Sequence, residues 1–125
     1  MPHTLPIAII GAGPVGLAAA AHLLARGETP VVFEAGDAVA ESLRAWAHVR
    51  MFSPWGFNVD QAAADLLAAA GWTHPPKETL PTGGELVEQY LEPLASLPEM
   101  RRHIHVRTRV MGVTRKGYDK VRTAE

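Results

Sequence analysis

The sequence predicts an α/β fold in which one βαβ unit, an incomplete parallel sheet and a helical insertion make up a single domain. Three observations lead to this prediction. Residues 7–10 form a continuous apolar run of the kind found in a buried parallel strand. A glycine-rich turn and a helical stretch rich in alanine and leucine follow at once, over residues 11–26. A second short apolar run, residues 30–34, completes a βαβ unit that we place at residues 5–36.

The rest of the chain is expected to form a helical insertion at about 40–98 and a third strand region at about 103–115. One helix of the insertion should begin after Asp60, whose side chain can accept hydrogen bonds from the first helical turn. Another should begin at Thr82 or a neighbouring glycine, and Pro93 should kink or shorten its end because proline lacks a backbone donor. Its apolar stripe comprises Leu86, Val87, Tyr90, Leu91 and Leu94.

The composition indicates one partial domain over residues 1–125 and excludes several classes of site. Apolar residues make up 47% of the chain and charged residues 20%, the ordinary balance of a globular protein. There is no cysteine, which excludes a disulfide framework, a thiol-relay redox centre and thiolate-bound zinc. No segment reaches the roughly 20 apolar residues that a membrane helix needs, and the start lacks the basic region of a secretory signal. We therefore expect a cytoplasmic location and no membrane partner.

Charge is divided unevenly along the chain. Residues 101–125 carry eight basic side chains and two acidic ones, a net charge of +6, which leaves −7 for residues 1–100. A basic segment can bind nucleic acid, but Tyr118 is the only aromatic ring of Phe, Tyr or Trp among these residues, and stacking rings usually accompany that function. We therefore favour packing of the basic segment on the acidic part or on missing sequence, and expect no nucleic-acid partner.

The pattern Gly11-x-Gly13-x-x-Gly16 stands directly after the first strand and opens the following helix, which is the context of a dinucleotide-binding loop in a Rossmann-like fold. Gly11 permits the tight turn, Gly13 lets the backbone approach a diphosphate, and Gly16 lets the helix pack closely on the sheet. Pro14 suits the first helical turn, because the N–H that it lacks would have no partner there. The helix dipole and free N–H groups attract the diphosphate. The alternative is a turn that binds no ligand.

Glu34 ends the second strand, 18 residues after Gly16. Its carboxylate can accept hydrogen bonds from both hydroxyl groups of an adenosine ribose, and its charge repels a 2′-phosphate, which disfavours NADP at this site. The alternative is a strand end that simply faces solvent.

Aromatic and polar side chains cluster between the second strand and the Asp60 helix. Trp46 and Arg50 can line a flavin ring, with Arg50 donating hydrogen bonds to cofactor oxygens. The alternative is a loop pinned to the core by its aromatic side chains, which we favour for Phe52 and Trp55 and leave open for the other two.

Two histidines, His103 and His105, fall on one face of the expected third strand, as two metal ligands would. No third ligand is evident, so we expect no metal site. No side chain stands out as a catalytic acid, base or nucleophile, and the catalytic residues stay unknown.

Two sets of residues resemble a known family. Gly11-Ala-Gly-Pro-Val-Gly-Leu17, with Glu34, resembles the FAD-binding N-terminus of flavoproteins that have two dinucleotide-binding domains. Trp46-Ala-His-Val-Arg-Met-Phe-Ser-Pro-Trp55 and Pro81-Thr-Gly83 are similar to bacterial flavoproteins related to flavin-containing monooxygenases and to FAD-dependent pyridine nucleotide oxidoreductases. The resemblance extends to about Lys120.

The resemblance implies a set of contacts with FAD. The glycine loop and Glu34 would bind the adenosine diphosphate half, the 42–46 segment would run near the flavin, and the backbone of Val110 would meet the adenine. The implied residues are Gly11, Ala12, Gly13, Pro14, Val15, Gly16, Glu34, Ala35, Gly36, Trp46, Arg50 and Val110.

Two departures from the family are evident. Relatives have a second glycine motif, in a second domain that binds NAD(P)H, and this sequence has none. Ala40-Glu-Ser-Leu-Arg44 stands where relatives often carry a glycine pair. We therefore expect the FAD-binding portion of a flavin-dependent, monooxygenase-like oxidoreductase, truncated and inactive alone, with NAD(P)H bound only by a complete relative.

The expected protein partner is a missing second domain, or a second copy joined through an exposed sheet edge. Two other functions stay open. One is a small NAD(H)-binding module that uses the same loop, and the other is a non-catalytic fragment that binds a partner through its basic C-terminal segment.

Overall fold

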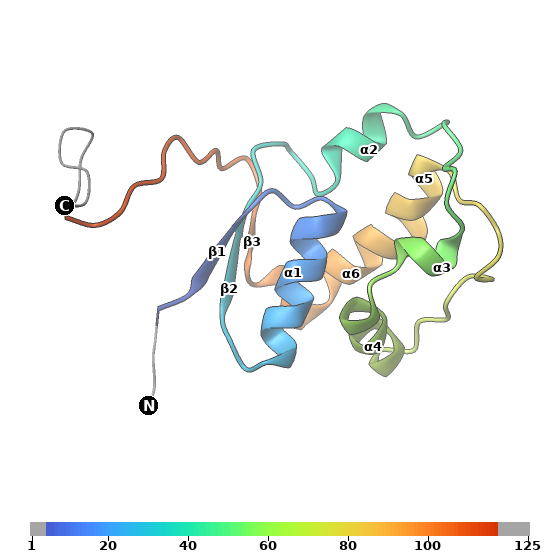
Figure 1. Cartoon of the computed structure of the whole chain (residues 1–125), viewed down its shortest axis with the longest axis horizontal. Helices are drawn as coiled ribbons and strands as arrows, with labels where there is room; N and C mark the ends of the chain where they lie inside the picture. The colour runs from blue at the N-terminus through green and yellow to red at the C-terminus, as the bar shows by residue number, and fades with distance from the viewer. Residues whose placement is uncertain (1–4, 118–125) are drawn as a thin grey trace.

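The computed structural model describes residues 5–117 and has the predicted α/β architecture. The strands are β1 (Ile7–Ile10), β2 (Pro30–Phe33) and β3 (Ile104–His105). They form one parallel sheet in the order β1–β2–β3, in which β1 and β2 pair along their whole length and Ile104 lies opposite Val32. The sheet stands at one end of the body and the helices extend to one side of it (Figure 1).

Most of the helical structure lies between β2 and β3. The helices are α1 (Pro14–Ala25), α2 (Glu41–Ala45), α3 (Trp55–Asn58), α4 (Gln61–Ala69), α5 (Gly83–Leu86), the π-helical segment η1 (Val87–Leu91), α6 (Glu92–Ser96) and α7 (Pro98–Arg101). The insertion predicted at about 40–98 therefore contains α2 to α6, and α7 carries helix slightly beyond it.

The helix of the βαβ unit, α1, ends where the sequence predicts. Gly27 follows its last turn with a φ of +76°, a conformation that glycine adopts without strain. The N–H of Gly27 donates to the Leu24 carbonyl at 3.0 Å, and the N–H of Glu28 donates to the Leu23 carbonyl at 2.9 Å. These two bonds make a Schellman motif, which turns the chain from α1 into β2.

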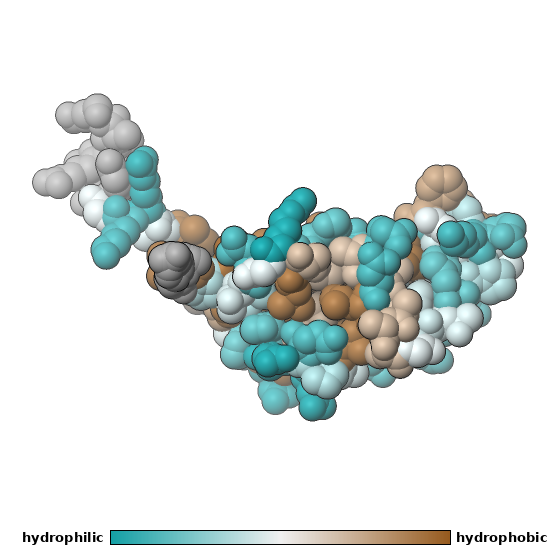
Figure 2. Space-filling model, turned by 90° about the horizontal axis from the view of Figure 1, so that it is seen from below, coloured by the Kyte–Doolittle hydropathy of each residue, from teal (hydrophilic) through white to brown (hydrophobic). Residues whose placement is uncertain are grey.

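The helix predicted after Asp60 is α4, and it packs against α1. The Asp60 carboxylate accepts a 3.0 Å hydrogen bond from the Ala63 N–H, as expected of an N-cap. Small buried side chains, among them Ala21 on α1 and Ala63 on α4, allow the two helices to approach closely. Seen from below, hydrophobic side chains gather over these two helices and polar side chains surround them (Figure 2).

A capping box begins the next helical run at Thr82. Its hydroxyl accepts from the Glu85 N–H at 3.0 Å, and the Glu85 carboxylate accepts from the Thr82 N–H at 2.8 Å. The run continues through α5, η1 and α6, and Pro93 lies in the first turn of α6, directly after the wider turns of η1. The predicted apolar stripe is buried in the core: Leu86, Val87, Tyr90, Leu91 and Leu94.

One face of the sheet is covered and the other is open in the described part of the chain. Val32 on β2 is fully buried, whereas Ile10 at the end of β1 is 64% exposed. Phe33 lies on the open face, where its ring stacks on that of His105 at 5.9 Å between ring centres. The outer edge of β1 has no strand beside it among residues 5–117.

The third strand is much shorter than predicted. The expected region at about 103–115 contains only β3, because Arg107 has a φ of +50° that ends the extended backbone. The chain is then held by the Arg107 and Thr108 N–H groups, which donate to the Gly36 and Glu34 carbonyls at 2.8 Å. Beyond Thr108, the described residues have no neighbouring strand with which to pair, so the alternating pattern of the sequence forms no ladder.

Candidate functional site

The glycine loop between β1 and α1 combines two glycines that the fold requires and one that it does not. Gly11 has a φ of +99°. A Cβ on Gly16 would lie 2.0 Å from the Gly11 carbonyl oxygen, so only glycine lets α1 pack this closely on the turn. Gly13 has an ordinary φ of −89°, and a Cβ there would meet no atom within 4 Å. The protein's own packing therefore gives no reason for a glycine at position 13.

Three backbone N–H groups at the start of α1 have no acceptor in the described part of the chain. They belong to Gly13, Val15 and Gly16, and Pro14 between them has no N–H. The Ala12 N–H has a protein acceptor, since it donates to Glu34 Oε1 at 2.8 Å. The start of α1 thus offers three N–H groups without a protein acceptor at the positive end of a helix of 12 residues, which suits a phosphate.

Glu34 lies beside this loop, as the sequence predicts. Its Oε1 accepts from the Ala12 N–H and its Oε2 accepts from the Gly36 N–H, at 2.8 and 2.7 Å. The two bonds fix the carboxylate next to the start of α1 while leaving lone pairs on both oxygens. The structure therefore brings together the glycine loop and the acid at the end of β2 with the acid already oriented.

The turn after Glu34 closes back on the glycine loop through Ala40. Ala40 has a φ of +59° and its N–H donates to the Ala12 carbonyl at 2.9 Å. Alanine rarely adopts this left-handed conformation, which costs roughly 1–2 kcal/mol relative to glycine. Sequence reasoning found that a glycine pair is replaced here but could not show that the backbone conformation of a glycine is kept.

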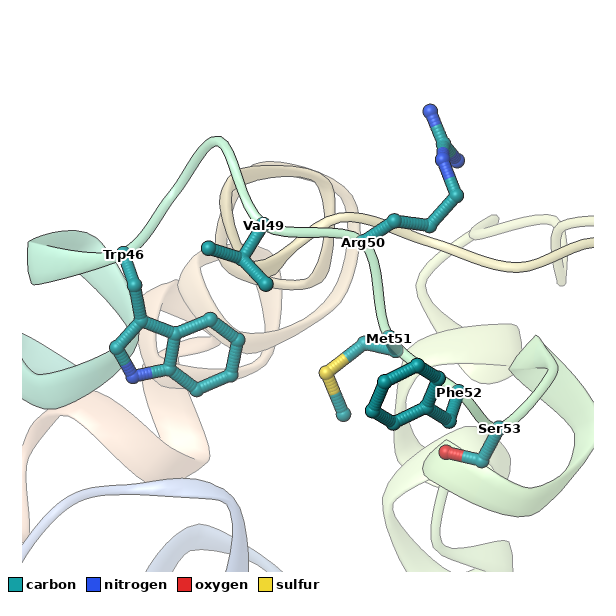
Figure 3. Close-up of a pocket in the computed structure, with 6 residues that line it drawn as sticks. All are labelled: Trp46, Val49, Arg50, Met51, Phe52 and Ser53. Carbon is teal, nitrogen blue, oxygen red and sulfur yellow. The ribbon is translucent and has the colours of Figure 1, made fainter.

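A pocket of about 510 Å³ opens after α2 and is lined by Trp46, Val49, Arg50, Met51, Phe52 and Ser53. The Trp46, Val49, Met51 and Phe52 side chains project into one space, whereas the Arg50 side chain points away from it (Figure 3). The chain is extended here, since Arg50 forms an antiparallel bridge with Thr82. Alternate side chains of an extended segment point to opposite sides, which is the signal that could have identified Val49 and Met51 as pocket residues.

Two predictions for this segment have different outcomes. Trp55 is 4% exposed and pins the loop to the core, as favoured from the sequence. The same interpretation was wrong for Phe52, which is fully exposed and lines the pocket after α2. The periodicity of a loop does not reveal which of its aromatic rings reaches the core, because that depends on helices far away in the sequence.

Arg50 has protein partners in this structure. Its Nη1 donates to the Leu80 carbonyl and lies 3.8 Å from Glu85 Oε1. Arg50 therefore ties the pocket segment to the start of α5, and its predicted contact with cofactor oxygens stays a prediction.

A second pocket, between α1 and the α3–α4 region, was not anticipated from the sequence. Its lining residues are Pro14, Val15, Ala18, Phe57, Asn58, Val59, Asp60, Gln61 and Tyr90. The Asp60 N–H donates to the Tyr90 hydroxyl at 3.1 Å, and Asp60 Oδ1 lies 2.8 Å from Nε2 of His22. Burial raises the pKa of Tyr90, and the nearby Asp60 charge raises it further, whereas the hydrogen bond from the Asp60 backbone lowers it.

The two histidines of the third strand region do not form a metal site with other residues of the described chain. Among residues 5–117, no group of three or more His, Cys, Asp or Glu side chains is placed to hold a metal ion. Desolvation lowers the pKa of His103, and the neighbouring Arg102 and His105 lower it further. Val110 is partly buried in the segment that follows β3.

Comparison with known proteins identifies the family. A family model described as pyridine nucleotide-disulphide oxidoreductase matches residues 8–124. The chain belongs to this family. The 125 residues include no cysteine, so this chain supplies no dithiol for disulphide chemistry.

Solved structures share the fold of this family member. An oxidized steroid monooxygenase bound to NADP is 24% identical with a TM-score of 0.61, covering 82% of this chain and 19% of that one. A mutant cyclohexanone monooxygenase from Rhodococcus sp. Phi1 bound to NADP+ is 24% identical with a TM-score of 0.61, covering 85% and 20%.

A third structure, FAD-bound OTEMO, is 20% identical with a TM-score of 0.61, covering 88% of this chain and 20% of that one. The chain therefore spans about a fifth of the length of the solved structures that it matches. No curated protein matches the sequence.

Membership of the pyridine nucleotide-disulphide oxidoreductase family and the shared fold confirm the resemblance inferred from the sequence and the predicted fold class. In the described part of the chain, no helix is long and apolar enough to cross a membrane. The predicted contacts of individual residues with a cofactor stay predictions, and the glycine loop, Glu34 and the pocket are the places at which to test them.

Proposed function

We propose that this chain is the FAD-binding portion of a flavin-dependent, monooxygenase-like oxidoreductase. The adenosine diphosphate of FAD lies on the glycine loop with its ribose at Glu34, and the flavin ring lies in the pocket after α2. FAD supplies the redox chemistry when it is bound, while this chain binds and orients the cofactor. NAD(P)H belongs to the complete relatives, because the sequence has one glycine motif and not two.

The observation that carries the proposal is the open space at Gly13. Gly11 and Gly16 are explained by a positive φ and by close packing, but no atom of residues 5–117 would lie within 4 Å of a Cβ on Gly13. The N–H groups of Gly13 and Val15 have no acceptor among the described residues. A ligand whose phosphates approach the backbone is the physical reason for a glycine there.

The position of the apolar pocket supports a ligand that has another aromatic ring system besides its adenine. The Ala40 N–H bonds to the Ala12 carbonyl, so α2 starts at the glycine loop, and Trp46 follows its last residue. A helix of five residues advances the chain by about 7.5 Å, so α2 leads from the diphosphate loop to the pocket. Because its side chains are mainly apolar and include an indole, the pocket fits a planar aromatic ring such as a flavin.

The test is the visible absorption spectrum of the purified chain after incubation with FAD and desalting. Retained flavin absorbance supports the proposal. Two variants sharpen it: Gly13→Val fills the open space, and Gly13→Ser fills it while placing a preferred N-cap residue at the start of α1. Both should lose flavin, and Gly13→Ser should keep its thermal stability.

The result that counts against autonomous FAD binding is absence of retained flavin in a chain that circular dichroism shows to be folded. Binding of NADH without FAD would then favour the NAD(H)-binding module. A ligand signal that falls steeply with added salt and survives Gly13→Val would favour the basic C-terminal segment. An unfolded chain without flavin would instead indicate a need for the remainder of a longer protein.

We also propose that the outer edge of β1 pairs with another polypeptide, either the remainder of a longer flavoprotein or a second copy of this chain. Supporting this, Ile7 and Ile10 on this strand are 40% and 64% exposed, and no charged residue lies between Leu5 and Ile10 to discourage pairing. Light scattering separates the two partners. A dimer that Ala8→Lys abolishes indicates self-association, and a monomer leaves the edge to the remainder of a flavoprotein.

A further inference from the structure

The turn after Glu34 brings a second carboxylate to the predicted ribose position. A Cβ built on Gly36 would lie 2.3 Å from Glu41 Cγ, 3.1 Å from Glu41 Cδ and 3.1 Å from Glu34 Oε2. The two acidic side chains therefore lie on either side of the same point of the turn, beside Gly36. The Glu34 oxygen on this side, Oε2, also accepts the Gly36 N–H at 2.7 Å, and Glu41 is exposed to solvent.

The backbone fixes this arrangement. The left-handed conformation of Ala40 and its bond to the Ala12 carbonyl reverse the chain, so that Glu41 becomes the first residue of α2. Gly36 leaves room for the Glu41 side chain in this position, because a Cβ on residue 36 would lie 2.3 Å from Glu41 Cγ. The acidic pair thus follows from a turn that is itself tied to the glycine loop.

The basic residue of α2 is engaged elsewhere in the described part of the chain. Arg44, one turn further along α2, donates to Glu92 Oε2 and to the Val39 carbonyl at 2.8 and 2.9 Å. Neither Glu34 nor Glu41 forms an ion pair with a described residue. A ligand at this position therefore meets two negative charges that nothing in contact with them offsets.

We infer that Glu41 is a specificity-determining residue that acts with Glu34 to admit an unphosphorylated adenosine ribose and to exclude a 2′-phosphate. The inference rests on the proposed function, because it needs the ribose at Glu34. Glu34 accepts the ribose hydroxyls, and Glu41 adds a second negative charge at the same turn, beside Gly36. A phosphate brought there is repelled by both carboxylates, whereas a hydroxyl can donate to one of them.

The experiment compares ADP-ribose with its 2′-phosphate by isothermal titration calorimetry at low salt, since the two probes differ only in the phosphate. The wild-type chain should bind ADP-ribose and discriminate against the 2′-phosphate. Glu41→Gln should improve binding of the 2′-phosphate by about tenfold, a change of about 1.4 kcal/mol, and should change ADP-ribose binding by less than about threefold. Added salt should reduce the discrimination of the wild type, because it screens like charges.

The matched control is Asp37→Asn, which removes the same charge from an exposed residue of the same turn. Its ratio of affinities for the two probes should stay within about twofold of the wild type. If Glu41→Gln leaves this ratio unchanged while ADP-ribose still binds, the inference is overturned and the proposed function stands. If a folded wild-type chain binds neither probe, the proposed function fails and takes the inference with it.

Discussion

The indole N–H of Trp72 donates a 2.7 Å hydrogen bond to the backbone carbonyl of Gln89, four residues before Pro93. In a regular helix this carbonyl would accept from the N–H of residue 93, which proline lacks. Trp72, in the loop after α4, thus supplies a hydrogen-bond donor in place of the one that Pro93 lacks. The wider turns of η1 lie just before Pro93. The hydrogen bond that Pro93 cannot form within the helix is therefore replaced by one from the Trp72 side chain, which is distant in sequence.

This relationship predicts a coupling between Trp72 and Pro93. Trp72→Phe should lower the free energy of unfolding by about 0.5–1.5 kcal/mol, the usual contribution of one hydrogen bond. In a Pro93→Ala background the cost should be smaller, because the substituted alanine provides a backbone N–H for the Gln89 carbonyl. Urea unfolding of the four proteins of this double-mutant cycle measures the coupling. Strictly additive changes would show that the two residues act independently.

The geometry of the glycine loop predicts that substitutions at Gly16 and Gly13 have very different effects on the free energy of unfolding. Gly16→Ala should lower the free energy of unfolding by about 1–3 kcal/mol or more, because its Cβ would lie 2.0 Å from a backbone oxygen that cannot move away freely. Gly13→Ser should change it by less than about 0.5 kcal/mol, since the Cβ meets nothing and serine is a good N-cap. Urea unfolding without cofactor measures both. Equal losses would contradict the assignment of structural and ligand-facing roles.

Much of the fold could be predicted from the sequence because its signals are local. The strand, glycine turn and helix around Gly11–Gly16, the Asp60 cap and the stripe from Leu86 to Leu94 all follow from neighbouring residues. The end of β3 could not be predicted, because the alternating pattern after His105 shows that a segment can be a strand but not whether a partner strand is present.

The parts of the candidate site that belong to a sequence motif could be predicted. The parts that depend on the tertiary fold could not. The glycine pattern located the loop and Glu34 correctly beside each other. Nothing local to Glu41 indicates that its side chain lies at the same turn as Glu34, since that placement depends on the left-handed turn at Ala40 and on its bond to Ala12. For the same reason the sequence could not tell that Phe52 is exposed while Trp55 is buried.

The raised pKa of Tyr90 predicts a loss of stability at alkaline pH. Burial favours the neutral phenol in the folded chain, so its pKa there is higher than the ordinary value near 10 in the unfolded chain. The neutral phenol stabilises the fold fully below the unfolded pKa, and this stabilisation is lost as the pH rises through 10 toward the folded pKa.

Tyr90→Phe should therefore show a smaller fall in the free energy of unfolding above about pH 9.5 than the wild type, when both are unfolded in urea at a series of pH values. Tyr118→Phe removes the other tyrosine of the sequence and is the control. Parallel pH profiles for the wild type and Tyr90→Phe would show that Tyr90 does not ionise in this range during unfolding.

Phe52 predicts a separation of ligand binding from stability. Its ring is fully exposed at the pocket, so Phe52→Ala should change the free energy of unfolding by less than about 0.5 kcal/mol. If the flavin ring lies there, the same change should weaken FAD binding by about tenfold, because a stacked aromatic contact contributes roughly 0.5–1.5 kcal/mol beyond the area that it buries.

Phe57→Ala is the matched control, since Phe57 is 85% exposed but lines the other pocket. Quenching of flavin fluorescence on titration with each protein measures the affinities. Equal affinities for FAD in the wild type and Phe52→Ala would place the flavin ring elsewhere, and a loss in Phe57→Ala alone would move it to the pocket beside Asp60 and Tyr90.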